Sequence, residues 1–183
     1  MNKLRIAFYK AQNGNWDDKL IDRFSGGLGY SHCEVVVNST TMIGAHYLAK
    51  GVAKFRYNDI YSDPMWDIYE IDMDNAQTIS YAEFMVGRLG YDTTGVVLYF
   101  IGLHMGDDKT DVWCSEFCAR AINKGFNPKG VDKLIDNVLT MPNEFYTDFL
   151  ALGAIKVNKL NARRNRTHKN KPTIDRYGRV AYA

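Results

Sequence analysis

The first part of the chain alternates apolar and polar residues, which is typical of half-buried β-strands. In the first of these segments Leu4, Ile6 and Phe8 alternate with Arg5 and Ala7. The predicted strands are residues 4–10, 31–37, 42–43, 51–57 and 66–72. Polar or turn-forming residues separate them, as expected for hairpins. The pattern therefore predicts an antiparallel meander sheet of four or five strands.

Beyond residue 72 the apolar residues recur every three or four positions, which is typical of amphipathic helices. The helices predicted in this part are residues 76–89, 95–103, 111–125, 131–139 and 142–152. A shorter helix is expected before the second strand, with Leu20, Ile21 and Phe24 facing the core. Strands followed by helices predict an α+β fold in which the meander sheet packs against helices.

The predicted helix at residues 111–125 carries a cysteine in its first turn. Thr110 or Asp111 can cap this helix, and Cys114 then lies in the first turn. The unpaired N–H groups and the positive end of the helix dipole favour a thiolate at such a position. They can lower a cysteine pKa from about 8.5 to between about 3.5 and 7.5. Cys114 is therefore the candidate nucleophile.

A base for this nucleophile is available in the predicted strand at residues 31–37. Alternation along the strand places His32 and Glu34 on one face and Cys33 on the other. An imidazole and a carboxylate that point the same way suit a base and the acid that orients it. The three residues Cys114, His32 and Glu34 therefore form a candidate cysteine-histidine-acid triad.

The third member of this triad has alternatives. Glu34 can also be an ordinary solvated or ion-paired strand residue. His46 lies on the strand after the next turn and would sit across from His32 in a hairpin. His46 therefore competes with Glu34 for the third role.

Acyl transfer also needs hydrogen-bond donors for the oxyanion that forms on the attacked carbonyl. The backbone N–H of Cys114 is one natural donor, and a hydroxyl of Tyr9 or Tyr30 is a candidate for the second. Asp92 precedes a predicted helix, where it can be an N-cap or can support a loop at the cleft.

The other two cysteines are interpreted as core residues. Cys118 lies one helical turn beyond Cys114, and Cys33 should pack under the sheet. His32 and Cys33 cannot both face one ion from a regular strand, and the ligand spacing typical of zinc sites is absent from the sequence. Neither a metal nor another cofactor is therefore expected.

Composition agrees with a folded protein of one main domain. The chain has 183 residues, of which 46% are hydrophobic, and this is enough to form a core. The longest apolar run is too short to span a bilayer, and no signal-peptide pattern precedes the first strand. With three cysteines and no secretory context, we expect reduced thiols in a soluble protein made in the cytoplasm.

Charge divides the chain into an acidic body and a basic tail. Residues 156–183 carry nine Lys or Arg and one acid, a net charge of +8, so residues 1–155 carry −6 of the overall +2. The tail lacks apolar periodicity and is not expected to fold by itself. Its basic cluster, a candidate contact for nucleic acid or another partner, consists of Arg163, Arg164, Arg166, Lys169 and Lys171. The predicted boundary separates a catalytic domain, residues 1–155, from the tail.

The order of the motifs resembles a known family. Ser31-His-x-Glu34 and a sheet come first, then Tyr91-Asp-x-x-Gly95, and then Trp113-Cys-Ser-Glu-Phe117. This order is similar to that of the circularly permuted, NlpC-like branch of the papain-fold cysteine hydrolases, and closest to small phage-encoded members. The resemblance covers residues 4–125 and excludes the tail.

The resemblance implies that Cys114 is the nucleophile, His32 the base and Glu34 the orienting acid. The same branch includes lecithin retinol acyltransferase-like enzymes, which use a second histidine on the adjacent strand, and His46 occupies that place here. Members cleave amide bonds in cell-wall peptides or move acyl groups of lipids.

Three classes of function follow from these patterns. The first is a thiol hydrolase of peptidoglycan peptide bonds that works through a thioester, with lipid acyl hydrolysis or transfer as an alternative. The second is a structural or docking component of a virion, with the fold as scaffold and the tail as anchor. The third is contact of the basic cluster with nucleic acid, for which the simpler interpretation is a solvated tail.

Overall fold

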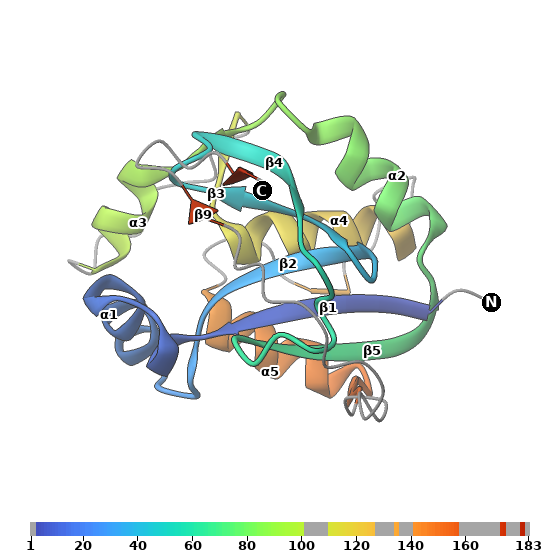
Figure 1. Cartoon of the computed structure of the whole chain (residues 1–183), viewed down its shortest axis with the longest axis horizontal. Helices are drawn as coiled ribbons and strands as arrows, with labels where there is room; N and C mark the ends of the chain where they lie inside the picture. The colour runs from blue at the N-terminus through green and yellow to red at the C-terminus, as the bar shows by residue number, and fades with distance from the viewer. Residues whose placement is uncertain are drawn as a thin grey trace.

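In the part of the chain that the computed structural model describes, eight strands form one curled, mixed sheet (Figure 1). The described residues are 3–100, 110–126, 134–135, 141–157, 173–174 and 180–181. The strands of this sheet are β1 (Lys3–Lys10), β2 (Tyr30–Asn38), β3 (Thr41–His46), β4 (Gly51–Arg56), β5 (Trp66–Asp74), β6 (Gly90–Tyr91), β7 (Asp111–Val112) and β8 (Ile155–Lys156). Their order is β7-β6-β4-β3-β2-β1-β5-β8. The predicted α+β class is confirmed.

Five α-helices accompany the sheet in the described residues. They are α1 (Trp16–Phe24), α2 (Ala76–Met85), α3 (Thr93–Phe100), α4 (Cys114–Phe126) and α5 (Pro142–Ala151). In the view of Figure 1, α4 and α5 lie behind the sheet, where both pack on β2. The helix expected at residues 131–139 lies almost wholly outside the described residues. Among the described helices, none has the length and apolar character needed to cross a bilayer.

The simple meander holds for β1 to β4 and is wrong for β5. Antiparallel pairs join β1 to β2, β2 to β3 and β3 to β4. β5 instead pairs antiparallel with β1, on the opposite side of the sheet from β4. The intervening segment of residues 57–65 crosses one face of the sheet, where Ile60 is fully buried. Its apolar contacts hold the chain in this crossover, which alternation within the strands cannot reveal.

The two faces of the sheet have different surroundings. The helix-covered face builds the main core, to which β1 and β2 contribute Leu4, Ile6, Phe8, Cys33 and Val35. The other face carries a smaller apolar cluster, which consists of Ala7, Val36, Met42, Ile60, Trp66 and Ile68. His32 and Glu34 point to the side of this second cluster, since they alternate with Cys33 and Val35 along β2.

Helix α1 turns its apolar stripe outward, contrary to the sequence prediction. None of its residues is buried, and Trp16 and Phe24 expose 74% and 54% of their surfaces. The inward side is polar: Asp18 accepts a hydrogen bond from the Ser31 hydroxyl at 2.7 Å. On the same side Asp22 accepts the Gly29 N–H at 2.7 Å. Periodicity identifies the stripe of a helix but not the side that faces the protein, and here hydrogen bonds decide it.

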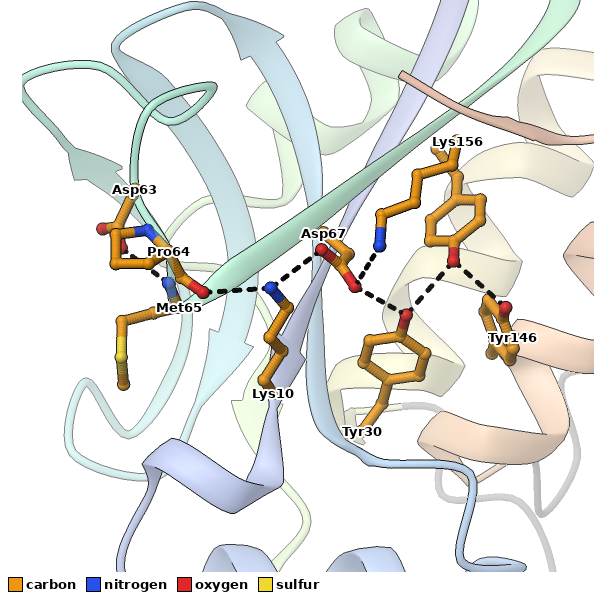
Figure 2. Close-up of polar contacts among 9 residues, drawn as sticks. Lys10, Tyr30, Asp63, Pro64, Met65, Asp67, Tyr146 and Lys156 are labelled. Carbon is orange, nitrogen blue, oxygen red and sulfur yellow. Dashed lines mark hydrogen bonds and ion pairs between the residues drawn. The ribbon is translucent and has the colours of Figure 1, made fainter. Parts of the chain in front are cut away.

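A polar network around Asp67 ties β1, β2, β5 and β8 together (Figure 2). Lys10 Nζ lies 3.0 Å from one carboxylate oxygen, and Lys156 Nζ lies 2.7 Å from the other. Tyr30 donates its hydroxyl hydrogen to Asp67 Oδ2 at 3.0 Å. The hydroxyl of Tyr69 lies 3.2 Å from that of Tyr30 and continues the network to α5. Because β8 includes Lys156, the sheet extends into the first residue of the predicted tail.

We expect Asp67→Asn to destabilise the fold at neutral pH more than at acid pH. Burial raises the pKa of Asp67, but hydrogen bonds from Lys156, Lys10 and Tyr30 outweigh it and lower the pKa below its usual value. A lowered carboxyl pKa gives stability that is present above the unfolded-state pKa and lost as the pH falls through the folded-state pKa. We expect Asn to lower the free energy of unfolding by about 2 kcal/mol at neutral pH.

Urea unfolding at neutral pH and at a pH below the folded-state pKa of Asp67, well under about pH 4, measures this difference between wild type and Asp67→Asn. The control is Asp72→Asn, because Asp72 lies exposed on the same strand. A loss of stability that is equal at both pH values would show that the Asp67 carboxylate charge contributes nothing.

Candidate active site

Helix α4 begins at Cys114, so Cys114 lies in the first turn as the sequence predicts. The predicted start at residue 111 and the caps Thr110 or Asp111 are wrong, because Asp111–Val112 form β7 and pair with β6. Phe117, Ala121 and Ile122 are fully buried and hold the helix against the sheet. Cys114 occupies the first position of the helix, where backbone N–H groups have no partner within the helix and the dipole is positive. The sequence alone thus locates the sulfur at the helix end that favours a thiolate.

Glu34 is buried beside His32 on the same face of β2. His32 Nε2 lies 3.2 Å from Glu34 Oε1, and the Glu34 side chain exposes only 1% of its surface. The Tyr57 hydroxyl donates a longer hydrogen bond, 3.4 Å, to the same oxygen. Oε2 of Glu34 is buried without a hydrogen-bond partner among the described residues. A carboxylate this deeply buried is costly unless a cation pairs with it, so Glu34 favours the imidazolium form of His32.

Gly44 on β3 provides the space for this carboxylate. A Cβ atom at Gly44 would lie 2.6 Å from Cγ of Glu34, closer than real Cβ contacts allow. Glycine inside a strand often marks a close approach by a neighbouring group. Here the close group is the Glu34 side chain, whose carboxylate contacts His32.

Cys114 contacts two consecutive residues of β2. Its sulfur is in hydrogen-bond contact with the His32 side chain and with both the thiol and the backbone N–H of Cys33. His32 and Cys33 leave opposite faces of the strand, so the first turn of α4 must lie directly against this part of β2. Because His32 Nε2 faces Glu34, Nδ1 is the nitrogen left for the thiol.

The electrostatics of this pair favour a thiolate and an imidazolium. The hydrogen bond from the Cys33 thiol lowers the pKa of Cys114, burial raises it, and the charge of His32 lowers it; the result lies well below the usual value. Burial lowers the pKa of His32, but the Cys114 thiolate and Glu34 raise it well above 6.5. The attraction between the two charges and the hydrogen bonds therefore outweigh the cost of burying them.

The pair reaches solvent over a small area. Cys114 exposes 5% of its surface, and the His32 side chain exposes 15%. Partial burial strengthens the interaction between the charges, because water screens it less.

His46 approaches His32 in a different way from Glu34. The two imidazole rings meet edge to face with centroids 5.2 Å apart. His46 Nδ1 accepts the Leu48 backbone N–H at 3.3 Å. Burial and the neighbouring His32 lower the pKa of His46, which favours its neutral form. Glu34 thus has the ion-pair contact expected of an orienting acid, and His46 has a ring contact.

The three candidates for cleft support lie in different environments. Tyr9 pairs with His32 across the β1–β2 ladder, which places it next to the imidazole. The hydroxyl of Tyr30 is bonded to Asp67 and Tyr69 in the network of Figure 2, so it is already occupied. Asp92 accepts the Gly95 N–H at 2.6 Å and so caps α3.

Sequence reasoning missed Tyr91. The parallel pair of β6 and β7 sets Tyr91 opposite Val112, two residues before Cys114. Burial and the nearby charge of Cys114 raise the pKa of the Tyr91 hydroxyl, which stays protonated and can donate a hydrogen bond. The motif Tyr91-Asp-x-x-Gly95 contained this residue, but nothing in its spacing indicates a contact with Cys114.

Two other expectations concern metal binding and the tail. Within the described residues no group of three or more His, Cys, Asp or Glu side chains is placed to hold a metal ion. The basic cluster of the tail, Arg163, Arg164, Arg166, Lys169 and Lys171, lies outside the described residues. In the described parts of the tail, β9 (Thr173–Ile174) and β10 (Val180–Ala181) form a separate antiparallel pair.

Comparison with protein-family models, curated proteins and solved structures found no match for this chain. The resemblance to permuted NlpC-like hydrolases therefore remains a prediction from the motifs.

We expect Gly44→Ala to disturb the fold through Glu34. The added methyl group would overlap the Glu34 side chain, and overpacking of this kind costs about 1–3 kcal/mol of unfolding free energy. In a Glu34→Ala background the obstacle is gone, so the same substitution should cost much less. Urea unfolding of the two single variants and the double variant gives the interaction energy. Equal costs of Gly44→Ala in both backgrounds would contradict this account of Gly44.

Proposed function

We propose that this protein is a cysteine-dependent hydrolase of amide bonds, with Cys114 as nucleophile. The observation that carries the proposal is one chain of contacts: a sulfur at a helix start touches His32, and His32 bonds the buried Glu34. Nucleophile, base and orienting acid in hydrogen-bond reach of one another are the requirement for covalent catalysis by a thiol.

In the first half of the reaction the Cys114 thiolate attacks the carbonyl carbon of the substrate. The His32 imidazolium donates its proton to the leaving nitrogen, the C–N bond breaks, and a thioester remains on Cys114. The negative charge that develops on the carbonyl oxygen needs donors, for which the Cys114 backbone N–H and the Tyr91 or Tyr9 hydroxyl are candidates.

In the second half water hydrolyses the thioester. His32, now neutral, accepts a proton from water as the oxygen attacks the same carbonyl carbon. The tetrahedral intermediate then expels the Cys114 thiolate and releases the carboxylic acid. Glu34 keeps the imidazole oriented and stabilises its protonated form in each half.

Peptidoglycan peptide is the proposed substrate class, on the strength of the resemblance to small phage-encoded hydrolases. One structural observation favours a second candidate, a lipid acyl ester. The outward stripe of α1, formed by Trp16, Leu20 and Phe24, suits contact with lipid. The inward side of this helix is bonded to Ser31, the residue before His32, and the stripe lies on its outward side.

The test supplies both substrate classes to the purified protein. Cell-wall fragments are examined by mass spectrometry for new peptide termini, and phospholipid vesicles are examined for released fatty acid. The control is protein blocked with iodoacetamide at Cys114, which is feasible because Cys33 and Cys118 are fully buried. New termini that vanish on blocking support the amidase, and fatty acid supports the lipid alternative. If neither new peptide termini nor fatty acid is detected, or if these products still form after blocking, the proposal of thiol hydrolysis is overturned.

The remaining two functions depend on the tail. Docking to a virion and contact with nucleic acid are both proposed from its net charge of +8 alone.

A further inference from the structure

All three cysteines of the chain meet in one place. Cys33 on β2 and Cys114 and Cys118 on α4 belong to the same buried cluster, and each is a free thiol. Burial raises the pKa of the Cys33 thiol well above its usual value, and side-chain hydrogen bonds with Cys114 and Cys118 raise it further. In the proposed hydrolysis the Cys33 thiol donates a hydrogen bond to Cys114 but takes part in no bond-making step.

Covalent geometry selects one pair among the three. Cys114 and Cys118 are one turn apart on the same helix, which separates their Cβ atoms by about 5–6 Å. A disulfide requires about 3.5–4.5 Å between Cβ atoms, so that pair would have to distort α4. Cys33 instead approaches from a separate strand, with its thiol and its backbone N–H both at the Cys114 sulfur.

Exposure selects the sulfur that an oxidant reaches first. Cys114 exposes 5% of its surface, whereas Cys33 and Cys118 expose 0%. A small hydroperoxide can therefore reach Cys114 and not the other two. The helix start also favours the thiolate of Cys114, and the thiolate is the form of cysteine that reacts with peroxides.

We propose that Cys33 is a resolving thiol, which converts hydroperoxide-oxidised Cys114 into a reversible Cys33–Cys114 disulfide. In the first step the Cys114 thiolate attacks the peroxide, the O–O bond breaks, and an S–OH group forms as alkoxide or hydroxide leaves and takes a proton. In the second step the Cys33 sulfur attacks the sulfur of this sulfenic acid. The S–O bond breaks, the S–S bond forms, and the hydroxide leaves as water with the proton of Cys33.

The consequence is a protective switch in the candidate active site. The disulfide removes the nucleophile, so any thiol chemistry at Cys114 stops while oxidant is present. It also prevents further oxidation to the sulfinic acid, which is not reversed by ordinary thiols. A dithiol reductant restores both cysteines.

The experiment maps the disulfide in the full chain after brief hydrogen peroxide treatment and alkylation of the remaining thiols. A glutamate-specific protease cuts after Glu116, which separates Cys114 from Cys118 in the digest. We expect wild type to lose the mass of two hydrogen atoms, to yield a peptide that joins Cys33 to Cys114, and to recover with dithiothreitol. Cys33→Ala should instead gain the mass of two oxygen atoms at Cys114, without recovery.

The matched control is Cys118→Ala, which removes an equally buried thiol from the same cluster and should still form the disulfide. Oxygenated Cys114 without a disulfide in wild type, or a disulfide to Cys118, would overturn the proposal. If Cys33→Ala does not fold, the disulfide map of peroxide-treated wild type alone tests the proposal. The readout is mass and needs no substrate, so a protein that forms the disulfide but cleaves nothing would refute the hydrolase and leave this inference intact.

Discussion

Replacing Cys114 with alanine is expected to lower the rate of amide hydrolysis by about 10⁵-fold or more, because the thioester cannot form without the sulfur. The fold should survive the change. Alanine keeps the first position of α4 and removes a charge from a buried site, so we expect the free energy of unfolding to change by no more than about 1 kcal/mol.

The measurement compares the initial rates of wild type and Cys114→Ala on the substrate class that wild type is found to cleave. Urea unfolding of each variant is measured alongside. Cys118→Ala is the matched control, since it removes a buried thiol one turn further along the same helix. It should keep most of the activity. If Cys114→Ala retains activity within about tenfold of wild type, Cys114 is not the nucleophile and covalent thiol catalysis is excluded.

The candidate pair of Cys114 and His32 could be placed from the sequence because both residues lie in strongly periodic segments. The apolar stripe of α4 and the turn-forming residues around it locate Cys114 at a helix start. Alternation along β2 sets His32 and Glu34 on one face. Each inference needs only local periodicity, which survives in most folds.

Features that depend on long-range packing could not be predicted from local periodicity in the sequence. The pairing of β5 with β1 rests on the burial of Ile60 in the crossover, and such contacts leave no periodic pattern. The inverted α1 has the apolar spacing of a core helix, yet Asp18 and Asp22 bond inward and decide its orientation. Hydrogen bonds between distant segments thus overrule local hydrophobic pattern.

The contact of Cys33 with Cys114 could be predicted from the sequence only in part. The sequence correctly places Cys33 in the core and on the face opposite His32, and this suggests that it is remote from the site. The start of α4, however, lies against β2 so closely that residues from both faces touch its sulfur. Gly44 inside β3, which sequence reasoning missed, is a local signal of crowding, because a glycine there is needed to accommodate Glu34.

Replacing His32 with glutamine is expected to shift the reactivity of Cys114 to higher pH and to lower hydrolysis by about 10⁴-fold or more. In wild type the contacts with Cys33 and the His32 imidazolium outweigh burial and lower the pKa of Cys114 well below its usual value, which favours the thiolate. Glutamine can still donate a hydrogen bond but carries no charge. The pKa of Cys114 therefore rises, and alkylation by iodoacetamide at about pH 6 should fall at least about tenfold.

The pH range in which the two alkylation rates differ distinguishes a raised pKa of Cys114 from a general loss of structure. Above the pKa of an ordinary thiol both proteins hold a thiolate, so the two alkylation rates should converge there, whereas a misfolded variant would react abnormally at every pH. His46→Gln is the matched control: its ring contacts His32 but favours the neutral form, so the onset of alkylation should stay near that of wild type. An unchanged onset in His32→Gln would mean that the helix dipole and the Cys33 contacts alone stabilise the thiolate. A shift in His46→Gln as large as that in His32→Gln would instead move His46 into the role assigned to Glu34.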